Sequence, residues 1–185
     1  GLGALIAVLS AVVPASAVAN GLWFYLFVGV MATVTADTWA TELGTLSAAP
    51  PRLITSGRVV EVGTSGGVSP LGTGVSLAGG LLIGLTVALF GPIAGILPWS
   101  AAPLVALVGA LSGASGSLLD SLMGATVQQI YYCDTCRKET ERRVHRCGTT
   151  TRPLRGWGWV NNDLVNLLSS LGGGLVAVGL GYWLL

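Results

Sequence analysis

The sequence predicts an all-α fold: a polytopic membrane bundle of about five transmembrane helices that carries one small cysteine-rich loop. Charged residues make up 9% of the 185 residues and apolar residues 52%, whereas a soluble domain carries about 25% charged residues. The apolar residues gather in runs of the roughly 20 residues that cross a bilayer. We therefore expect 1–185 to be a single transmembrane domain, interrupted by a basic Cys/His-rich loop at 127–158.

Two apolar runs open the chain. Leu2–Ala19 predicts a first span with a kink at Pro14. The alternative for this run is a signal peptide, because Ala15–Ala17 resembles a small-residue cleavage site, although no basic segment precedes it. A turn is expected at 20–21, and Leu22–Ser47 predicts the second span. The chain does not begin with Met, so we treat residue 1 as a cut within a longer protein.

Three further apolar runs follow. A polar, Gly-rich loop at 49–70 leads to a third span at Leu71–Phe90, and an uncharged connection at 92–100 leads to a fourth at Ala101–Ala125. Asn161–Leu185 predicts the fifth. The fourth span carries small residues at three- and four-residue spacing, a pattern that lets helices approach closely. These residues are Gly109, Gly113, Gly116 and Gly124.

The basic residues indicate the orientation of the spans. Seven of the nine lie between Arg137 and Arg155, and the other two lie in the 49–70 loop. With five spans, both charged loops fall on one side of the membrane and the uncharged connections on the other. Cytoplasmic loops carry an excess of Lys and Arg. We therefore expect an integral protein of the cell membrane with an active site on its cytoplasmic side.

Four acidic residues lie at the ends of the apolar runs: Asp37, Glu42, Asp120 and Asp163. In the five-span arrangement all four lie at cytoplasmic helix ends. A charge at the bilayer centre costs about 2.5–3.5 kcal/mol, and acids within spans mark functional sites. We expect these acids to meet at one catalytic site, balanced by a divalent metal, a metal–phosphate complex or basic loop residues. The alternative is that they join helices through hydrogen bonds.

Helix geometry sets a condition on the first two acids. At 100° per residue, Asp37 and Glu42 point about 140° apart on a regular helix. Both can reach one metal ion only if the helix ends or unwinds near Thr41–Gly44. If the helix stays regular, we expect Glu42 to have an indirect role.

The loop before the third span is rich in glycine and hydroxyl groups. Such a loop can turn several backbone N–H groups toward one anion, and it leads into a helix N-terminus, which favours phosphate. Arg52 and Arg58 lie upstream and could clamp phosphate oxygens. No Gly-Lys-Ser/Thr follows, so this is not a Walker A motif. A flexible loop without function is the alternative. The candidate phosphate-binding residues are Gly63, Thr64, Ser65, Gly66 and Gly67.

The basic loop contains all three cysteines and the single histidine of the chain, Cys133, Cys136, His145 and Cys147. A Cys₃His set suits tetrahedral zinc, and cytoplasmic thiols stay reduced. Four protein ligands leave no open position, so such a zinc ion would be structural. A redox Cys-x-x-Cys pair and unliganded thiols are the alternatives. The surrounding basic residues also fit a loop near anionic headgroups.

Four motifs, in this order, resemble an integral-membrane family that includes the plant phytyl-phosphate kinase of the vitamin E pathway. They are ADTWATELG (36–44), PRLITSGRVVEVGTSGGVSPLG (51–72), LLDSLMGATVQ (118–128) and NNDLVN (161–166). The resemblance covers about residues 32–175. The chain is similar to the prokaryotic branch, which carries a CxxC…HxC insertion before the Asn-Asn-Asp motif. The plant version of this loop differs, which leaves the exact substrate open.

The resemblance implies transfer of a phosphoryl group from a nucleoside triphosphate, CTP or ATP, to an isoprenoid monophosphate, giving the diphosphate. It implies Mg²⁺ on Asp37, Asp120 and Asp163, with Glu42 beside them and Asn162 and Asn166 completing the shell. Arg52, Arg58 and the 63–67 amides would hold phosphates. The prenyl tail would lie in the bilayer, in a groove beside the glycine stripe of the fourth span. No nucleic-acid partner is implied, and the donor nucleotide, chain length and oligomeric state stay open.

Three other functions remain open at this point. Buried acids and Gly-rich helices also occur in transporters of ions or lipid phosphates. Another lipid phosphotransferase or nucleotidyltransferase would also use intramembrane acids, although the Asp-Gly-x-x-Ala-Arg signature of the alcohol-phosphotransferases is missing. A zinc-bearing scaffold without catalysis is the third.

Overall fold

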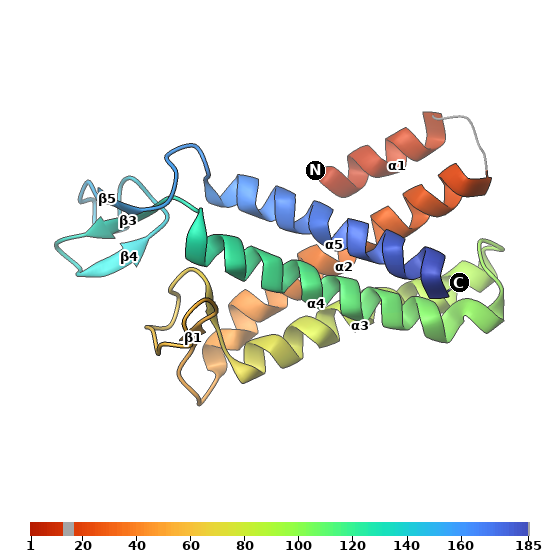
Figure 1. Cartoon of the computed structure of the whole chain (residues 1–185), viewed down its shortest axis with the longest axis horizontal. Helices are drawn as coiled ribbons and strands as arrows, with labels where there is room; N and C mark the ends of the chain where they lie inside the picture. Colours follow the sequence, from red (N-terminus) through yellow and green to blue (C-terminus); the bar gives the residue numbers. More distant parts are fainter. Residues whose placement is uncertain (13–16, 185) are drawn as a thin grey trace.

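The computed structural model describes residues 1–12 and 17–184, and these form the predicted helical bundle with two small sheets at one end (Figure 1). Four of the helices are long and apolar enough to cross a membrane. The helices are α1 (Leu2–Val12), α2 (Ala17–Leu43), α3 (Pro70–Ile93), α4 (Ala102–Thr126) and α5 (Asn162–Leu184). The all-α membrane fold is confirmed.

The first helix is shorter than the predicted span. α1 has 11 residues, about 16 Å of helix against a hydrocarbon core of about 30 Å. It packs on α2 through Ile6, which joins Leu26 and Val30 in one apolar cluster. The turn expected at 20–21 is wrong, because both residues lie inside α2. Gly21 faces Tyr182, whose hydroxyl would lie 3.2 Å from an added Cβ. The kink at Pro14 falls on residues 13–16, outside the described part.

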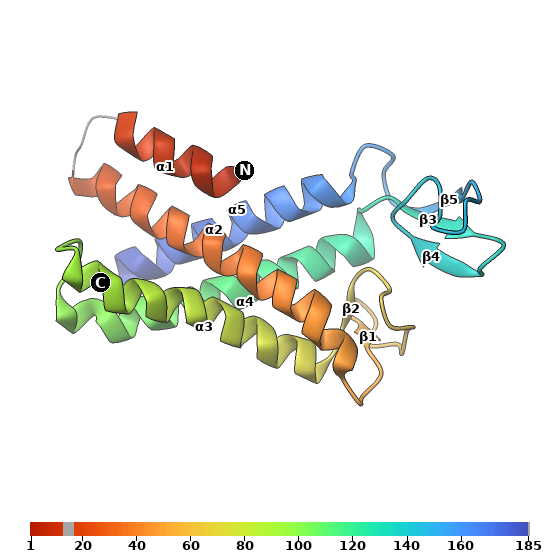
Figure 2. The same ribbon diagram turned by 180° about the vertical axis from the view of Figure 1, so that it is seen from behind.

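Helices α2 to α5 form one bundle (Figure 2), and small residues line several of their contacts. An added Cβ on Gly109 of α4 would lie 2.6 Å from the Cα of Gly84 in α3. On Gly113 it would lie 2.8 Å from Gly80 of α3 and 2.9 Å from the carbonyl of Ala32 in α2. The stripe predicted for the fourth span is thus confirmed as a packing surface. It is filled by neighbouring helices.

The third helix runs a turn further than expected. It continues through Gly91 and Pro92 to Ile93. Pro92 lies in the last turn, where the loss of one hydrogen bond costs little because the helix ends there. Its start is well defined. Ser69 accepts a hydrogen bond from the N–H of Gly72 at 3.0 Å, and Pro70 occupies the first turn, where proline is favoured.

Both charged loops lie at the same end of the bundle and form small antiparallel sheets (Figure 1). The first loop pairs β1 (Arg52–Leu53) with β2 (Gly67–Val68). The Cys/His-rich loop forms a three-stranded sheet in the order β4-β3-β5. Its strands are β3 (Ile130–Cys133), β4 (Lys138–Thr140) and β5 (Arg152–Arg155). The uncharged connection between α3 and α4 lies at the opposite end. The predicted grouping of the charged loops is confirmed, but sequence analysis did not anticipate the strands.

Candidate functional site

A cavity of about 370 Å³ opens at the end of the bundle that carries the charged loops. Its walls come from the end of α2, the start of α3, the end of α4, the start of α5 and both loops. Four carboxylates line it: Asp37, Glu42, Asp120 and Glu141. No basic side chain among the described residues lines it. An uncompensated cluster of four carboxylates is costly, and a cation beside them would lower that cost.

The two acids inside spans are each held by a serine of a neighbouring helix. The hydroxyl of Ser117 in α4 donates to Oδ1 of Asp37 in α2 at 3.2 Å. The hydroxyl of Ser169 in α5 donates to Oδ2 of Asp120 in α4 at 3.0 Å. These bonds join helices, as the structural alternative expected, but each occupies one carboxylate oxygen. Because both acids also line the cavity, the bonds fix the two carboxylates at its wall.

Glu42 meets the condition set by helix geometry. Helix α2 ends at Leu43 and continues as a 3₁₀ turn over Gly44–Leu46. Gly44 makes this end possible, since an added Cβ would lie 3.1 Å from the Cα of Gly72 in α3. Asp37 and Glu42 therefore both line the cavity although they point to different sides of a regular helix.

The start of α5 contributes its asparagines and not its aspartate. Asn162 and Asn166 lie four residues apart on one helix face, and both line the cavity. Asp163 is rotated by about 100°; it is exposed and lies outside the lining. It sits in the first turn, where a carboxylate favours the helix dipole. Asn161 caps this helix, accepting the N–H of Leu164 at 2.9 Å.

All five residues of the Gly-rich loop line the cavity. Gly63 and Gly66 have φ of 88° and 83°, a region that favours glycine. The N–H of Thr64 donates to Glu61 and that of Gly67 donates to Thr64. Within the described residues, the amides of Gly63, Ser65 and Gly66 have no backbone hydrogen-bond partner, so these three donors are unpaired with the main chain.

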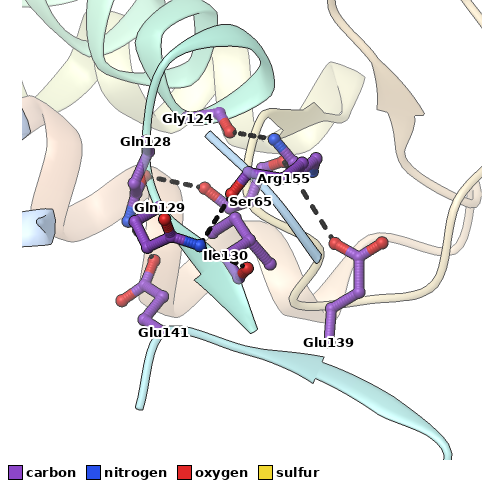
Figure 3. Close-up of polar contacts among 8 residues, drawn as sticks. All are labelled: Ser65, Gly124, Gln128, Gln129, Ile130, Glu139, Glu141 and Arg155. Atoms are coloured by element: carbon purple, nitrogen blue, oxygen red, sulfur yellow. Dashed lines mark hydrogen bonds and ion pairs between the residues drawn. The ribbon is translucent and has the colours of Figure 1, made fainter. Parts of the chain in front are cut away.

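The arginines expected at this loop lie elsewhere. Arg52 donates to the carbonyl of Gly57 at 2.8 Å and so closes its own turn. Neither Arg52 nor Arg58 lines the cavity, and both are exposed. Arg155 of β5 reaches the loop instead, donating to the carbonyl of Ser65 at 3.1 Å and to that of Gly124 at 2.7 Å (Figure 3). It fixes the loop against the end of α4.

Gln128 connects the walls of the cavity, and sequence analysis missed it. Its side chain is 1% exposed. Its Oε1 accepts from the hydroxyl of Ser65 at 2.9 Å. Its Nε2 donates to Glu141 at 2.9 Å (Figure 3). The same nitrogen donates to Asn162 at 3.4 Å. Gln128 ends the third motif, which was a signal for it. Glu141 gave none, because it lies in a segment whose charge is mostly basic.

A second cavity of about 470 Å³ adjoins the first on the side of the Cys/His-rich loop. The two share Gly63, Ser65 and Glu141. The second differs in charge, because Arg142 and Arg146 line it together with Glu139 and Glu141. An acid-lined cavity therefore adjoins one lined by side chains of both signs.

The four predicted zinc ligands converge. The ligand atoms of Cys133, Cys136, His145 and Cys147 all lie within 4.8 Å of one another. The three thiols form no disulfide. The hydroxyl of Thr149 and the ring of His145 lower the pKa of the Cys147 thiol to about 5. The hydrogen bond with Cys147 raises the pKa of the Cys136 thiol to about 11. Metals bind the thiolate form of cysteine.

The fold and this site define a polytopic helical membrane protein with an acid-lined cavity at one end of its bundle. The chain belongs to the integral membrane protein family DUF92, whose model matches residues 1–174. This confirms the family predicted from the four motifs.

Two relatives illustrate the match. The chain is 39% identical over 151 residues to Protein PGR of Arabidopsis thaliana, covering 78% of this chain and 50% of the relative. It is 34% identical over 153 residues to the uncharacterised membrane protein MJ0933 of Methanocaldococcus jannaschii, covering 82% of this chain and 49% of the relative. The chain thus spans about half the length of these relatives. No solved structure matches it.

Proposed function

We propose that this protein is a membrane-embedded kinase that transfers a phosphoryl group from a nucleoside triphosphate to an isoprenoid monophosphate, on the cytoplasmic side of the membrane. One observation carries the proposal: an acid-lined cavity without basic side chains among the described residues, bordered by a glycine loop with three unpaired amides. Carboxylates and phosphates share such a cavity only with a cation between them.

The donor atoms fit Mg²⁺. The lining offers carboxylate and amide oxygens, the ligands that this ion prefers. Among the described residues its acids do not converge as tightly as the Cys/His set does. That spacing suits Mg²⁺, which is bound through one or two carboxylates and keeps waters and substrate phosphates. Asp37 and Asp120 would hold it, with Glu42, Glu141, Asn162 and Asn166 facing its waters. When bound, it neutralises charge on the transferred group.

The chain's own groups bind and orient the substrates. The amides of Gly63, Ser65 and Gly66 would donate to phosphate oxygens, where preorganised donors stabilise developing charge. An oxygen of the acceptor phosphate attacks the γ-phosphorus, the bond to the bridging oxygen breaks, and the nucleoside diphosphate leaves. The acceptor is already anionic, so the reaction needs no strong general base. This agrees with a cavity without histidine among its lining residues.

The two adjoining cavities suit a reaction with two substrates. The second cavity, lined by Arg142 and Arg146, would take the nucleotide, because arginines pair with its phosphates. The acceptor would enter the first from the bilayer side. Leu118 lines the first cavity and is exposed, as are Leu111 and Leu122 on the same helix. This apolar stripe on α4 offers the isoprenoid chain a surface within the bilayer.

A product assay tests the proposal. The full-length protein in detergent is incubated with Mg²⁺, with CTP or ATP, and with isoprenoid monophosphates of several lengths, and the diphosphate is sought by mass spectrometry. Product is expected with at least one pair. Its absence with every pair, from protein that remains folded, would contradict the proposal.

Labelling separates this proposal from a transporter. A transporter exposes its midplane acids alternately to both sides, whereas the acids here lie at one end of the bundle. Single added cysteines at positions 37 and 120 are expected to react with membrane-impermeant reagent from the cytoplasmic face, above the labelling of the native thiols measured in the wild type. Reaction from both faces would favour transport.

A further inference from the structure

The three-stranded sheet is too small to be stable by itself. Its strands have four, three and four residues. Folded units below about 40 residues usually need a disulfide, a metal or a partner. Within the sheet only Ile130 and Cys133 have side chains that are 1% exposed or less, so its apolar core is minimal. Something other than a core must hold its far edge.

The positions of the sulfur atoms match a metal tetrahedron. With zinc–sulfur bonds of about 2.3 Å, two sulfurs of a tetrahedral site lie about 3.8 Å apart. Sγ of Cys133 lies 3.7 Å from Sγ of Cys147, and Nδ1 of His145 lies 3.2 Å from the same atom. Sulfur and imidazole in tetrahedral arrangement select zinc over magnesium or calcium.

The backbone also turns sharply beside the cluster. Arg137, directly after Cys136, has φ of 54°, which is uncommon for a residue with a side chain and costs about 1–3 kcal/mol. Gly148, directly after Cys147, has φ of 82°. Each turn directly follows a cysteine of the cluster, so the backbone bends at the two places where these side chains converge.

The base of the sheet is joined to the bundle beside the cavity. The N–H of Gln129 donates to Val160 at 2.8 Å, and that of Trp157 donates to Val127 at 3.0 Å. The sheet therefore has a fixed base, and the Cys/His cluster closes its other end. Glu141 follows β4, four residues before His145, and its carboxylate reaches Gln128 and lines both cavities.

We propose that Cys133, Cys136, His145 and Cys147 bind one zinc ion, and that this ion holds the β3–β5 sheet as a cap that places Glu141 at the acid-lined cavity. The zinc site stands independently of the reaction. The role of Glu141 as a positioning residue rests on the proposed kinase function.

Metal content and proteolysis test the zinc site without using activity. Elemental analysis of the purified full-length protein is expected to give about one zinc per chain, lost in Cys136→Ser and kept in the control Lys138→Gln, an exposed neighbour. Trypsin is expected to cut the cap slowly in the wild type, faster after chelation, and slowly again after zinc is restored. Iron in place of zinc, or equal cleavage rates with and without metal, would overturn the assignment. If Cys136→Ser does not fold, chelation of the wild-type protein provides the metal-free sample.

A cycle of perturbations tests the link to Glu141. Zinc removal and Glu141→Gln are each expected to slow phosphoryl transfer by roughly 10- to 100-fold, the usual range for groups that orient metal ligands. Zinc removal from Glu141→Gln is expected to add little, because the two perturbations act through one group. Full multiplication of the two effects would overturn the link. Absence of transfer in every sample, with zinc content and protection intact, would instead refute the kinase.

Discussion

Replacing Gln128 by leucine removes the hydrogen bonds that join three walls of the cavity. The hydrogen bond that Gln128 accepts from Ser65 joins two neutral groups and is worth about 1 kcal/mol. The bond that it donates to the Glu141 carboxylate involves a charged group and is worth about 2 kcal/mol. The 3.4 Å contact with Asn162 adds little. We therefore expect Gln128→Leu to lower the free energy of unfolding by about 3 kcal/mol. Leucine is close in volume, so packing changes little.

The assay is reversible unfolding in detergent micelles with a rising fraction of SDS. Thr126→Val is the matched control, because the Thr126 hydroxyl bonds within its own helix to Leu122 at 2.7 Å and faces outward. It is expected to change the unfolding free energy by less than about 0.5 kcal/mol. If the two variants were equally stable, Gln128 would not be the connection described.

Three further predictions follow from the site and its packing. Asp37→Asn and Asp120→Asn each slow phosphoryl transfer on the order of 100-fold. Asp163 lies outside the cavity, so Asp163→Asn changes the rate less than about twofold. An equal loss of rate in Asp163→Asn would contradict the site. Arg155→Gln frees the glycine loop, so it lowers the unfolding free energy by about 2 kcal/mol and raises KM for the nucleotide. The control Arg52→Gln changes neither quantity. Matching effects in the two arginine variants would refute the role of Arg155. Gly109→Ala forces a Cβ against the backbone of Gly84 and lowers the free energy of unfolding by about 1–3 kcal/mol. In the control Gly179→Ala the added Cβ meets nothing within 4 Å, so the same SDS titration shows no change.

The sequence predicted the bundle because apolar runs must cross a bilayer as helices. It also predicted that both charged loops lie at one end, because alternate connections between spans lie on the same side of a membrane. It failed at residues 20–21, where a turn signal lies inside α2. Asn-Gly ends a helix in water, but apolar neighbours on both sides allow a membrane helix to continue, where Gly is common.

The candidate site was predicted in part. Asp37, Asp120, Asn162 and the glycine loop were found because polar groups in apolar surroundings are conspicuous. Asp163 follows Asn162 in the sequence, but consecutive residues of a helix point about 100° apart. Asp163 therefore points away from the cavity that Asn162 lines. Arg52 and Arg58 were chosen for charge and proximity in sequence, although their loop folds on itself through the bond from Arg52 to Gly57.

Gln128 and Glu141 could not be assigned from sequence because their roles depend on the tertiary fold. Gln128 is neutral, and only its burial beside three polar partners makes it a connection. Glu141 reaches the cavity because β4 folds back along β3, an arrangement set by short strands and by the Cys/His cluster. Strands this short leave little periodicity to read.

The proposed reaction is tested by the transfer of label from γ-³²P-labelled nucleoside triphosphate to an isoprenoid monophosphate. A labelled isoprenoid diphosphate is expected to form with Mg²⁺ and to be lost with chelator, and its yield is expected to fall on the order of 100-fold in Asp37→Asn and Asp120→Asn. Label that stays in the nucleotide or appears only as free phosphate, from folded protein given both donors and acceptors of several lengths, would contradict it.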